Sequence, residues 1–250
     1  MGSLSATLPW DSAFFGFPTA KLLPARLDRN ALAATLAELG AEGVRLVYWA
    51  SDPVDAESRA AAAANQGFLA DEKTTYRIPL ASRPAPPFPS AHVIVPLSAV
   101  HKKNFAPALL ALGHRAGLHS RFRTDPRMPA GKCETLYEEW MRKSLSGERA
   151  DAVLACLSSD GKSVQGAVTV SASKGAGRIG LIAVAEAEEG HGVGSALTHA
   201  ALAWVHRSGC GQAEVVTQGR NGAACRLYEK AGFRISRRED FYHFWLSARP

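Results

Sequence analysis

Residues 189–197 read Glu-Gly-His-Gly-Val-Gly-Ser-Ala-Leu, and this stretch decides the fold. It follows an apolar, strand-like run at 179–184 and opens an apolar pattern of helical spacing. A glycine-rich turn between a strand and a helix leaves bare backbone N–H groups at the helix N-terminus, where the helix dipole favours negative charge. The stretch therefore predicts a site for a pyrophosphate or another anion. Because similar glycines also form plain tight turns, a second signal is needed.

The second signal lies some thirty residues further along the chain. Asn221 precedes a predicted helix at 222–231, and residues 227–233 read Leu-Tyr-Glu-Lys-Ala-Gly-Phe. Asn221 and Tyr228 are seven residues apart, so on a helix they project to one face, two turns apart. The structural alternatives are a helix N-cap for Asn221 and a core aromatic for Tyr228.

Composition limits the classes of partner. The 250-residue chain has a formal net charge of +6, which favours anionic partners such as nucleotides and coenzymes. The basic residues are scattered and lack the interleaved aromatics of a single-strand binder, so we expect no nucleic acid. No apolar run approaches the roughly 20 residues that span a bilayer, and residues 1–9 do not resemble a signal peptide. We expect no membrane insertion and a cytoplasmic location. The four cysteines lack metal-ligand spacing, so we expect no metal.

The proline-rich stretch at 81–90 predicts a domain junction. We expect a small N-terminal α/β domain over 1–85, with the linker at its end, and a larger domain over 86–250. No internal repeat is evident. The patterns in the first part predict helices at 28–39 and 56–66, a strand at 44–49 and extended chain at 68–80. In the second part they predict strands and helices that alternate to form a mixed central sheet flanked by helices, with extended hairpin material at 233–246. The strands on either side of the helix after the glycine turn should be parallel.

Together, the run at 179–184, the glycines at 190–194, Asn221 and the 227–233 segment resemble the GNAT superfamily of acyl-CoA-dependent N-acetyltransferases. The resemblance covers roughly residues 90–248 and implies a GNAT-like fold for the larger domain. One position departs from the family pattern. The glycine motif of the family begins with Arg or Gln, whereas this chain has Glu189, a carboxylate that would repel a pyrophosphate if it pointed inward.

The resemblance implies acetyl-CoA as co-substrate and a role for each motif. The pyrophosphate would lie on the glycine turn, formed by Gly190, His191, Gly192, Val193, Gly194 and Ser195, with Asn221 nearby. The pantetheine arm would pair with a splayed strand at Ile182, Ala183 and Val184. Tyr228 would be the general acid that protonates the departing thiolate.

A narrower resemblance concerns the acceptor. Residues 10–16, 120–123 and 137–140 look like those of bacterial dTDP-fucosamine acetyltransferases, which implies a small anionic nucleotide-sugar substrate. Arg121, Phe122 and Arg123 would then bind the substrate, with Arg127 a further candidate for its diphosphate.

Two questions stay open at the level of sequence. The candidate base is Glu72, acting directly or through water, with Asp125 as the second candidate. The alternative acceptors are another small amine, an antibiotic or a protein terminus, and a non-catalytic acyl-CoA-binding module is the alternative from another class. An apolar sheet edge would let two copies pair as a homodimer.

Overall fold

The computed structural model describes residues 3–80 and 92–246, so the predicted proline-rich junction at 81–90 lies outside it. Its strands are β1 (Ser5–Thr7), β2 (Thr19–Leu22), β3 (Leu46–Ser51), β4 (Phe68–Pro79), β5 (Val93–Pro96), β6 (Ala152–Leu157), β7 (Val164–Ser173), β8 (Ala176–Val184), β9 (Gln212–Gln218) and β10 (Arg234–Trp245). Its helices are α1 (Pro9–Phe15), α2 (Arg29–Ala41), α3 (Ala56–Ala64), α4 (Ala99–Asn104), α5 (Ala106–Ala116), α6 (Arg121–Thr124), α7 (Lys132–Ser146), α8 (Val193–Arg207) and α9 (Gly222–Lys230), with a 3₁₀ turn, η1, at Glu186–Glu188.

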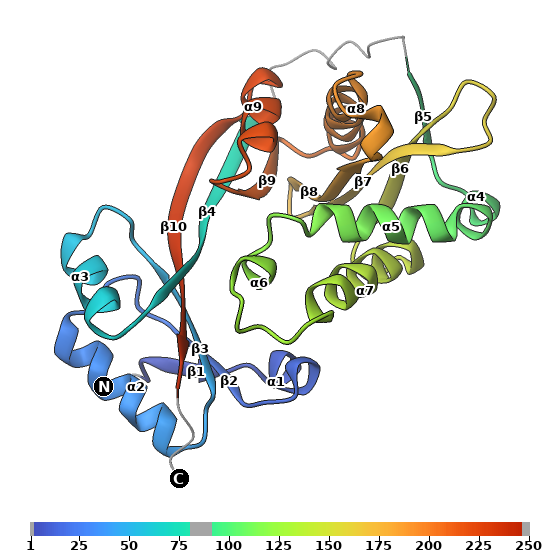
Figure 1. The fold of residues 1–250 in the computed structure, drawn as a ribbon. Helices are drawn as coiled ribbons and strands as arrows, with labels where there is room; N and C mark the ends of the chain where they lie inside the picture. Colours follow the sequence, from blue (N-terminus) through green and yellow to red (C-terminus); the bar gives the residue numbers. More distant parts are fainter. Residues whose placement is uncertain (1–2, 81–91, 247–250) are drawn as a thin grey trace.

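One mixed sheet of ten strands runs through the molecule in the order β1-β2-β3-β10-β4-β9-β8-β7-β6-β5. Helices α5 and α7 cover one face of its β6–β8 part, and α8 packs on the other face (Figure 1). The predicted mixed sheet flanked by helices is confirmed. The two strands joined by α8, β8 and β9, are parallel as expected.

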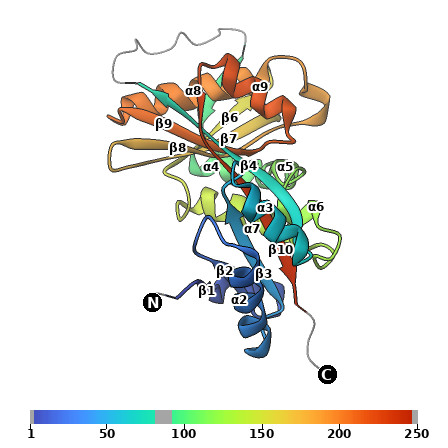
Figure 2. The ribbon, with the colours of Figure 1, turned by 90° about the vertical axis from the view of Figure 1, so that its left-hand side faces the viewer.

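The two halves of the sheet share one topology, which sequence inspection did not reveal. The series β1-β2-α2-β3-α3-β4 has the same order and strand directions as β7-β8-α8-β9-α9-β10, with an antiparallel first pair and a parallel second pair in each. The last strands are exchanged: β10 lies beside β3, and β4 lies beside β9. The long β4–β10 pair consequently joins the two halves (Figure 2).

Strand β4 has two faces with different surroundings. Side chains alternate along a strand, so Asp71, Lys73, Thr75 and Arg77 point to one face and Glu72, with its alternate neighbours, points to the other. This alternation decides which side chains can reach the site described below.

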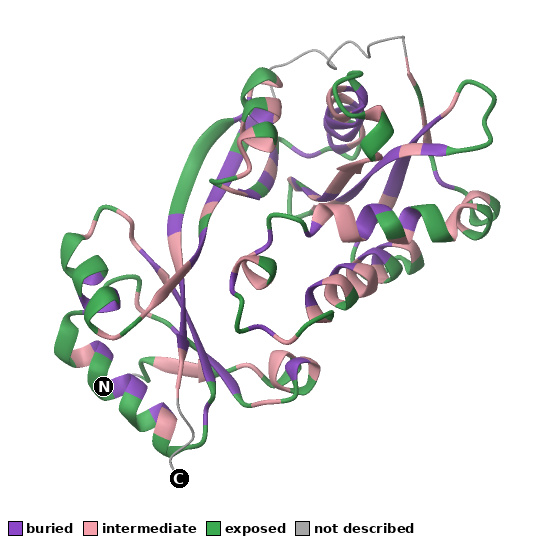
Figure 3. Cartoon of the chain, in the orientation of Figure 1, coloured by how far each residue is buried: buried purple, intermediate pink, exposed green. Residues whose placement is uncertain are grey.

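The core follows the predicted apolar stripes. Leu197 and Ala201 of α8 are fully buried against the sheet, and the burial map shows this buried layer between helices and strands (Figure 3). Two predictions need correction. In the segment predicted as hairpin material at 233–246, Arg234–Trp245 form the single long strand β10, because β4 and β3 pair with its two edges. The patterns also did not predict β1, α1, β2 and α6, each of which spans seven residues or fewer. Among the described helices, none is long and apolar enough to cross a membrane.

Candidate active site

The glycine turn has the backbone geometry expected of an anion site. Gly190 and Gly192 have positive φ angles of 81° and 86°, which L-residues with side chains rarely adopt. Gly192 is the N-cap of α8 and no side chain caps this helix. The first helical hydrogen bond runs from Ala196 N–H to the Gly192 carbonyl at 3.0 Å, so the three N–H groups before it remain for a ligand.

The equivalent helix of the first half is closed to an anion. Asp28 caps α2, and its Oδ1 accepts hydrogen bonds from the N–H groups of Asn30 and Ala31, both at 2.8 Å. Its carboxylate therefore occupies the position where a phosphate would bind. Of these two related helices, only α8 has a start that fits a pyrophosphate.

Beside the turn, β8 separates from β9. The two strands pair only from Ala176 to Ile179 of β8, which leaves the edge of residues 180–184 that faces β9 without a partner strand. A bulge precedes the opening, where Leu181 N–H donates to Thr169 Oγ1 at 2.8 Å. The open edge includes the predicted segment Ile182–Val184, and an extended amide-containing arm fits such an edge by strand-like pairing.

Helix α9 places the two predicted polar side chains below this opening. Asn221 caps α9, with its Oδ1 accepting a hydrogen bond from Ala224 N–H at 3.1 Å. The helix N-cap predicted as the structural alternative for Asn221 is therefore confirmed. Tyr228 is 2% exposed, and its ring lies 5.9 Å from that of Tyr76. Burial raises the pKa of Tyr228 well above its usual value, which keeps the hydroxyl protonated. Both Asn221 and Tyr228 line one cleft.

This cleft has a volume of about 660 Å³ and lies between the open strand edge, β4, β10, α6 and α7. Its polar lining is dominated by charge: five basic residues, Lys73, Arg77, Arg121, Arg178 and Arg237, face three acidic ones, Asp71, Glu214 and Glu239. An acyl donor on β8 and an acceptor in the cleft would meet at Tyr228. Within residues 3–80 and 92–246, no cluster of three His, Cys, Asp or Glu side chains offers a metal site.

The family comparison agrees with this geometry. Residues 117–233 match the model of the acetyltransferase (GNAT) family. The match covers slightly less than half of the 250-residue chain. The protein is an N-acetyltransferase, and acyl-CoA-dependent N-acetyl transfer is the general chemistry of the matched family. No curated protein matches the chain closely enough in sequence to count as a relative.

Solved structures resemble nearly the whole chain, not only residues 117–233. A GCN5-related N-acetyltransferase from Sphaerobacter thermophilus is 16% identical with a TM-score of 0.68, over 98% of this chain and 76% of that one. A tandem GNAT protein from the clavulanic acid biosynthesis pathway is 17% identical with a TM-score of 0.59, over 94% and 77%. A functionally unknown protein from Staphylococcus epidermidis is 12% identical with a TM-score of 0.66, over 99% and 93%. At these identities the likeness establishes the fold.

Only two of the four residues predicted to bind the acceptor lie in the cleft. Arg121 and Phe122 line the cleft. Arg123 does not: it pairs with Glu134 at 2.6 Å on the exposed side of α6. Arg127 lies outside the cleft lining as well and binds Asp125 at 3.1 Å.

Neither predicted base lies in the cleft. Glu72 points to the opposite face of β4, where it is half-exposed and lies 3.7 Å from Arg220. Asp125 is fully buried and accepts hydrogen bonds from His243 at 2.9 Å and Trp245 at 2.8 Å. The structure thus gives Asp125 a structural role, since all of its acceptor capacity is used.

Sequence reasoning missed the β4 residues that face the cleft. Asp71, Lys73, Thr75 and Arg77 are spaced by two, so the alternation of a strand predicted at 68–80 would have placed them together and Glu72 apart. The contributions of Arg178 and Arg237 could not be found this way, because they depend on how β8 and β10 pair.

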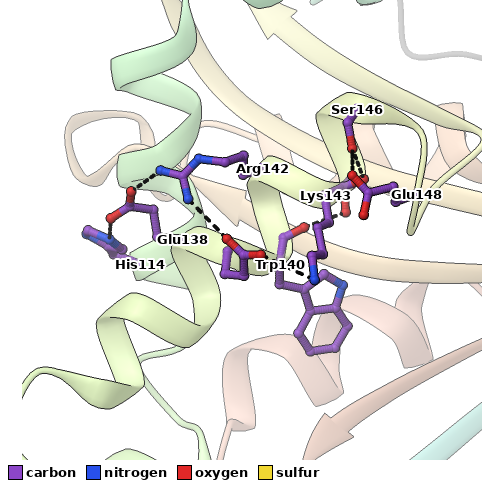
Figure 4. A network of polar contacts seen from close by, with 9 residues as sticks. His114, Glu138, Trp140, Arg142, Lys143, Ser146 and Glu148 are labelled. Carbon is purple, nitrogen blue, oxygen red and sulfur yellow. Dashed lines mark hydrogen bonds and ion pairs between the residues drawn. The ribbon is translucent and has the colours of Figure 1, made fainter. Parts of the chain in front are cut away.

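Helix α7 forms the far wall of the cleft. Figure 4 shows its outer side, where Arg142 pairs with Glu138 and Glu138 also meets His114 of α5 at 3.4 Å. Lys143 pairs with Glu139 at 3.3 Å on the same helix. Of these contacts, Glu138–His114 joins α7 to α5 and the other two lie within α7. Trp140 and Tyr137 of α7 line the cleft.

Glu189, which stands where the family motif has Arg or Gln, is paired by Arg115 of α5. Arg115 Nη2 lies 2.5 Å from Glu189 Oε1 and its Nη1 lies 3.1 Å from Glu186. The same guanidinium donates from Nε to the Val184 carbonyl at 2.9 Å, at the end of β8. Glu189 is therefore ion-paired, through a guanidinium that it shares with Glu186.

Replacing Arg115 by alanine is expected to weaken acetyl-CoA binding about tenfold, because Glu189 then faces the pyrophosphate unpaired. Calorimetric titration with acetyl-CoA measures the change in Kd. The double variant Arg115→Ala/Glu189→Gln should recover most of the affinity. If the double variant binds no better than Arg115→Ala, the repulsion argument is wrong and Arg115 acts through Val184 alone.

Proposed function

We propose that the protein transfers an acetyl group from acetyl-CoA to the amine of a nucleotide-linked amino-deoxy-sugar. The observation that carries the proposal is the single cleft in which Tyr228 and Asn221 share a wall with five basic side chains. An acceptor with a diphosphate matches this charge, and the N-terminal and 120–123 segments resemble enzymes with such acceptors.

The donor side follows from the glycine turn. The pyrophosphate binds the free N–H groups at the start of α8, from Val193 to Ser195, and the pantetheine arm lies along Ile182–Val184. The amine attacks the thioester carbonyl directly. Backbone N–H groups of β8 stabilise the oxyanion, and Tyr228 protonates the leaving thiolate.

The acceptor side follows from the charges on β4, β8, β9 and β10. Glu214 is shared by Arg77 at 2.8 Å and Arg178 at 3.5 Å, and Glu239 by Lys73 at 2.9 Å and Arg237 at 2.7 Å. Each carboxylate thus faces two cations, which leaves positive charge for the phosphates of the acceptor. Arg121 adds a fifth cation at the far end of the cleft.

A substrate panel tests the proposal. The purified protein is assayed for coenzyme A release with acetyl-CoA and, in turn, a dTDP-linked 4-amino sugar, a UDP-linked amino sugar, spermidine, an aminoglycoside and a peptide. The highest kcat/KM is expected for a nucleotide-linked sugar. Turnover of spermidine, the aminoglycoside or the peptide without turnover of either nucleotide sugar would refute this acceptor class.

Arg178→Ala is expected to raise KM for the nucleotide sugar about 10-fold or more and to leave KM for acetyl-CoA unchanged, because Arg178 is 69% exposed in the cleft and its loss leaves the Arg77–Glu214 bond intact. The matched control is Arg123→Ala, which removes a guanidinium outside the cleft lining. Equal effects of the two variants on KM would argue against a phosphate site at Arg178.

A further inference from the structure

Three carboxylates line the acceptor cleft, and they differ in their partners. Glu214 and Glu239 each form two ion pairs with basic side chains of the sheet. Asp71, 7% exposed, forms none with any residue that the structure describes. A carboxylate held by two cations is a poor proton acceptor, whereas Asp71 is free to take a proton from a ligand.

Arg121 lines the same cleft as Asp71, and one of its hydrogen-bond donors is also without a partner in the described residues. Its guanidinium lies 4.3 Å from the ring centroids of Tyr48 and Phe122 and 4.2 Å from that of Phe241. Its buried Nη1 has no hydrogen-bond partner among residues 3–80 and 92–246. A half-buried cation held by three aromatic rings and lacking one hydrogen bond is oriented for a ligand.

We propose that Asp71 is the general base of the transfer, with Arg121 binding an oxygen of the same acceptor. This inference rests on the proposed N-acetyl transfer and adds the proton acceptor that the reaction requires. Asp71 takes one proton from the acceptor ammonium. The neutral nitrogen then forms the C–N bond to the thioester carbon, and the tetrahedral oxyanion that results collapses with cleavage of the C–S bond. The thiolate takes its proton from Tyr228, which regains one from the nitrogen, and Asp71 releases its proton to solvent.

The surroundings of Asp71 suit this role near neutral pH. Burial raises the pKa of Asp71 to about 6, opposed by the charges of Arg121 on α6 and Arg220 after β9. The negative charge of Glu72 on β4 also raises the pKa of Asp71. Tyr137 on α7 faces the same site. Lys73 on β4 and the Arg237–Glu239 pair on β10 line the same cleft. A base with a pKa close to the working pH transfers protons efficiently.

The test compares Asp71→Asn with Glu72→Gln, two amide replacements at adjacent residues on opposite faces of one strand. Asp71→Asn should lower kcat about 10²–10⁴-fold and remove the acidic limb near pH 6 from the kcat profile, whereas Glu72→Gln should leave both within a factor of about two. A large loss of kcat in Glu72→Gln, together with an unchanged kcat in Asp71→Asn, would overturn the inference.

Thermal unfolding provides a readout independent of turnover. A carboxyl whose pKa is raised by folding destabilises the protein increasingly as pH rises from about 4 to 6. Asp71→Asn should therefore raise Tm at pH 8 and not at pH 4, with no such change in Glu72→Gln. If the wild type acetylates no amine of the panel, the proposed function fails. A Tm difference that does not depend on pH overturns the inference about Asp71 in either case.

Discussion

Tyr228→Phe is expected to lower kcat about 10²–10⁴-fold while the Kd for acetyl-CoA changes little. The thiolate leaves poorly without a proton donor, and burial keeps the Tyr228 hydroxyl protonated through the neutral range. The ring itself is retained, so its packing against Tyr76 and Phe233 should hold. Coenzyme A release under saturating substrates measures kcat, and calorimetry with acetyl-CoA measures Kd.

The control for this experiment is Tyr76→Phe. Tyr76 is equally buried and adjacent to Tyr228, but its hydroxyl donates to Glu229 at 2.9 Å, in a pocket on the opposite face of β4. We expect Tyr76→Phe to retain nearly full kcat. Unchanged turnover in Tyr228→Phe would remove Tyr228 as the general acid. Acetyl-CoA binding by the wild type without turnover of any amine would favour a non-catalytic binding module.

The largest expected effect on stability comes from Asp125→Ala, at about 2–6 kcal/mol. Asp125 joins the loop after α6 to β10, and its loss leaves two donors, the buried His243 Nδ1 and the part-buried Trp245 Nε1, without an acceptor. Denaturant unfolding followed by tryptophan fluorescence measures the change. Asp160→Ala, at an exposed turn, should change stability by less than about 0.5 kcal/mol. A loss below about 1 kcal/mol in Asp125→Ala would show that the buried cluster contributes little.

The same cluster predicts how stability depends on pH. Burial lowers the pKa of His243 to about 4, so on acidification below about 6.5 the unfolded chain takes up this proton first and stability falls. Hydrogen bonds from His243, Trp245 and Arg127 outweigh the burial that would raise the pKa of Asp125, so its pKa lies well below its usual value and its stabilisation is lost only in stronger acid. The stability difference between the wild type and Asp125→Ala should therefore stay nearly constant from pH 7 to about pH 4 and shrink only in stronger acid. A difference that changes appreciably between pH 7 and pH 5 would contradict the neutral-histidine arrangement.

The donor site and the acceptor site were predictable to different degrees. The glycine turn, Asn221 and Tyr228 lie within about 40 residues of one another, and local rules for helix starts and helix spacing were enough to predict that Asn221 and Tyr228 share one cleft. The neutralisation of Glu189 by Arg115 was not predictable, since α5 lies more than 70 residues away in sequence and meets the turn only through packing. The proposal of Asp71 rather than Glu72 as the general base depended on which face of β4 lines the cleft.

The sequence alone was enough to predict the family resemblance, the mixed sheet, the parallel β8–β9 pair and the position of Tyr228. Each of these predictions rests on short-range periodicity or on a local motif. Tertiary structure decided the exchange of β4 and β10, the charged lining of the cleft and the separation of Asp71 from Glu72. Strand exchange joins segments more than 150 residues apart, and side-chain contacts across it depend on pairing register, which local pattern does not encode.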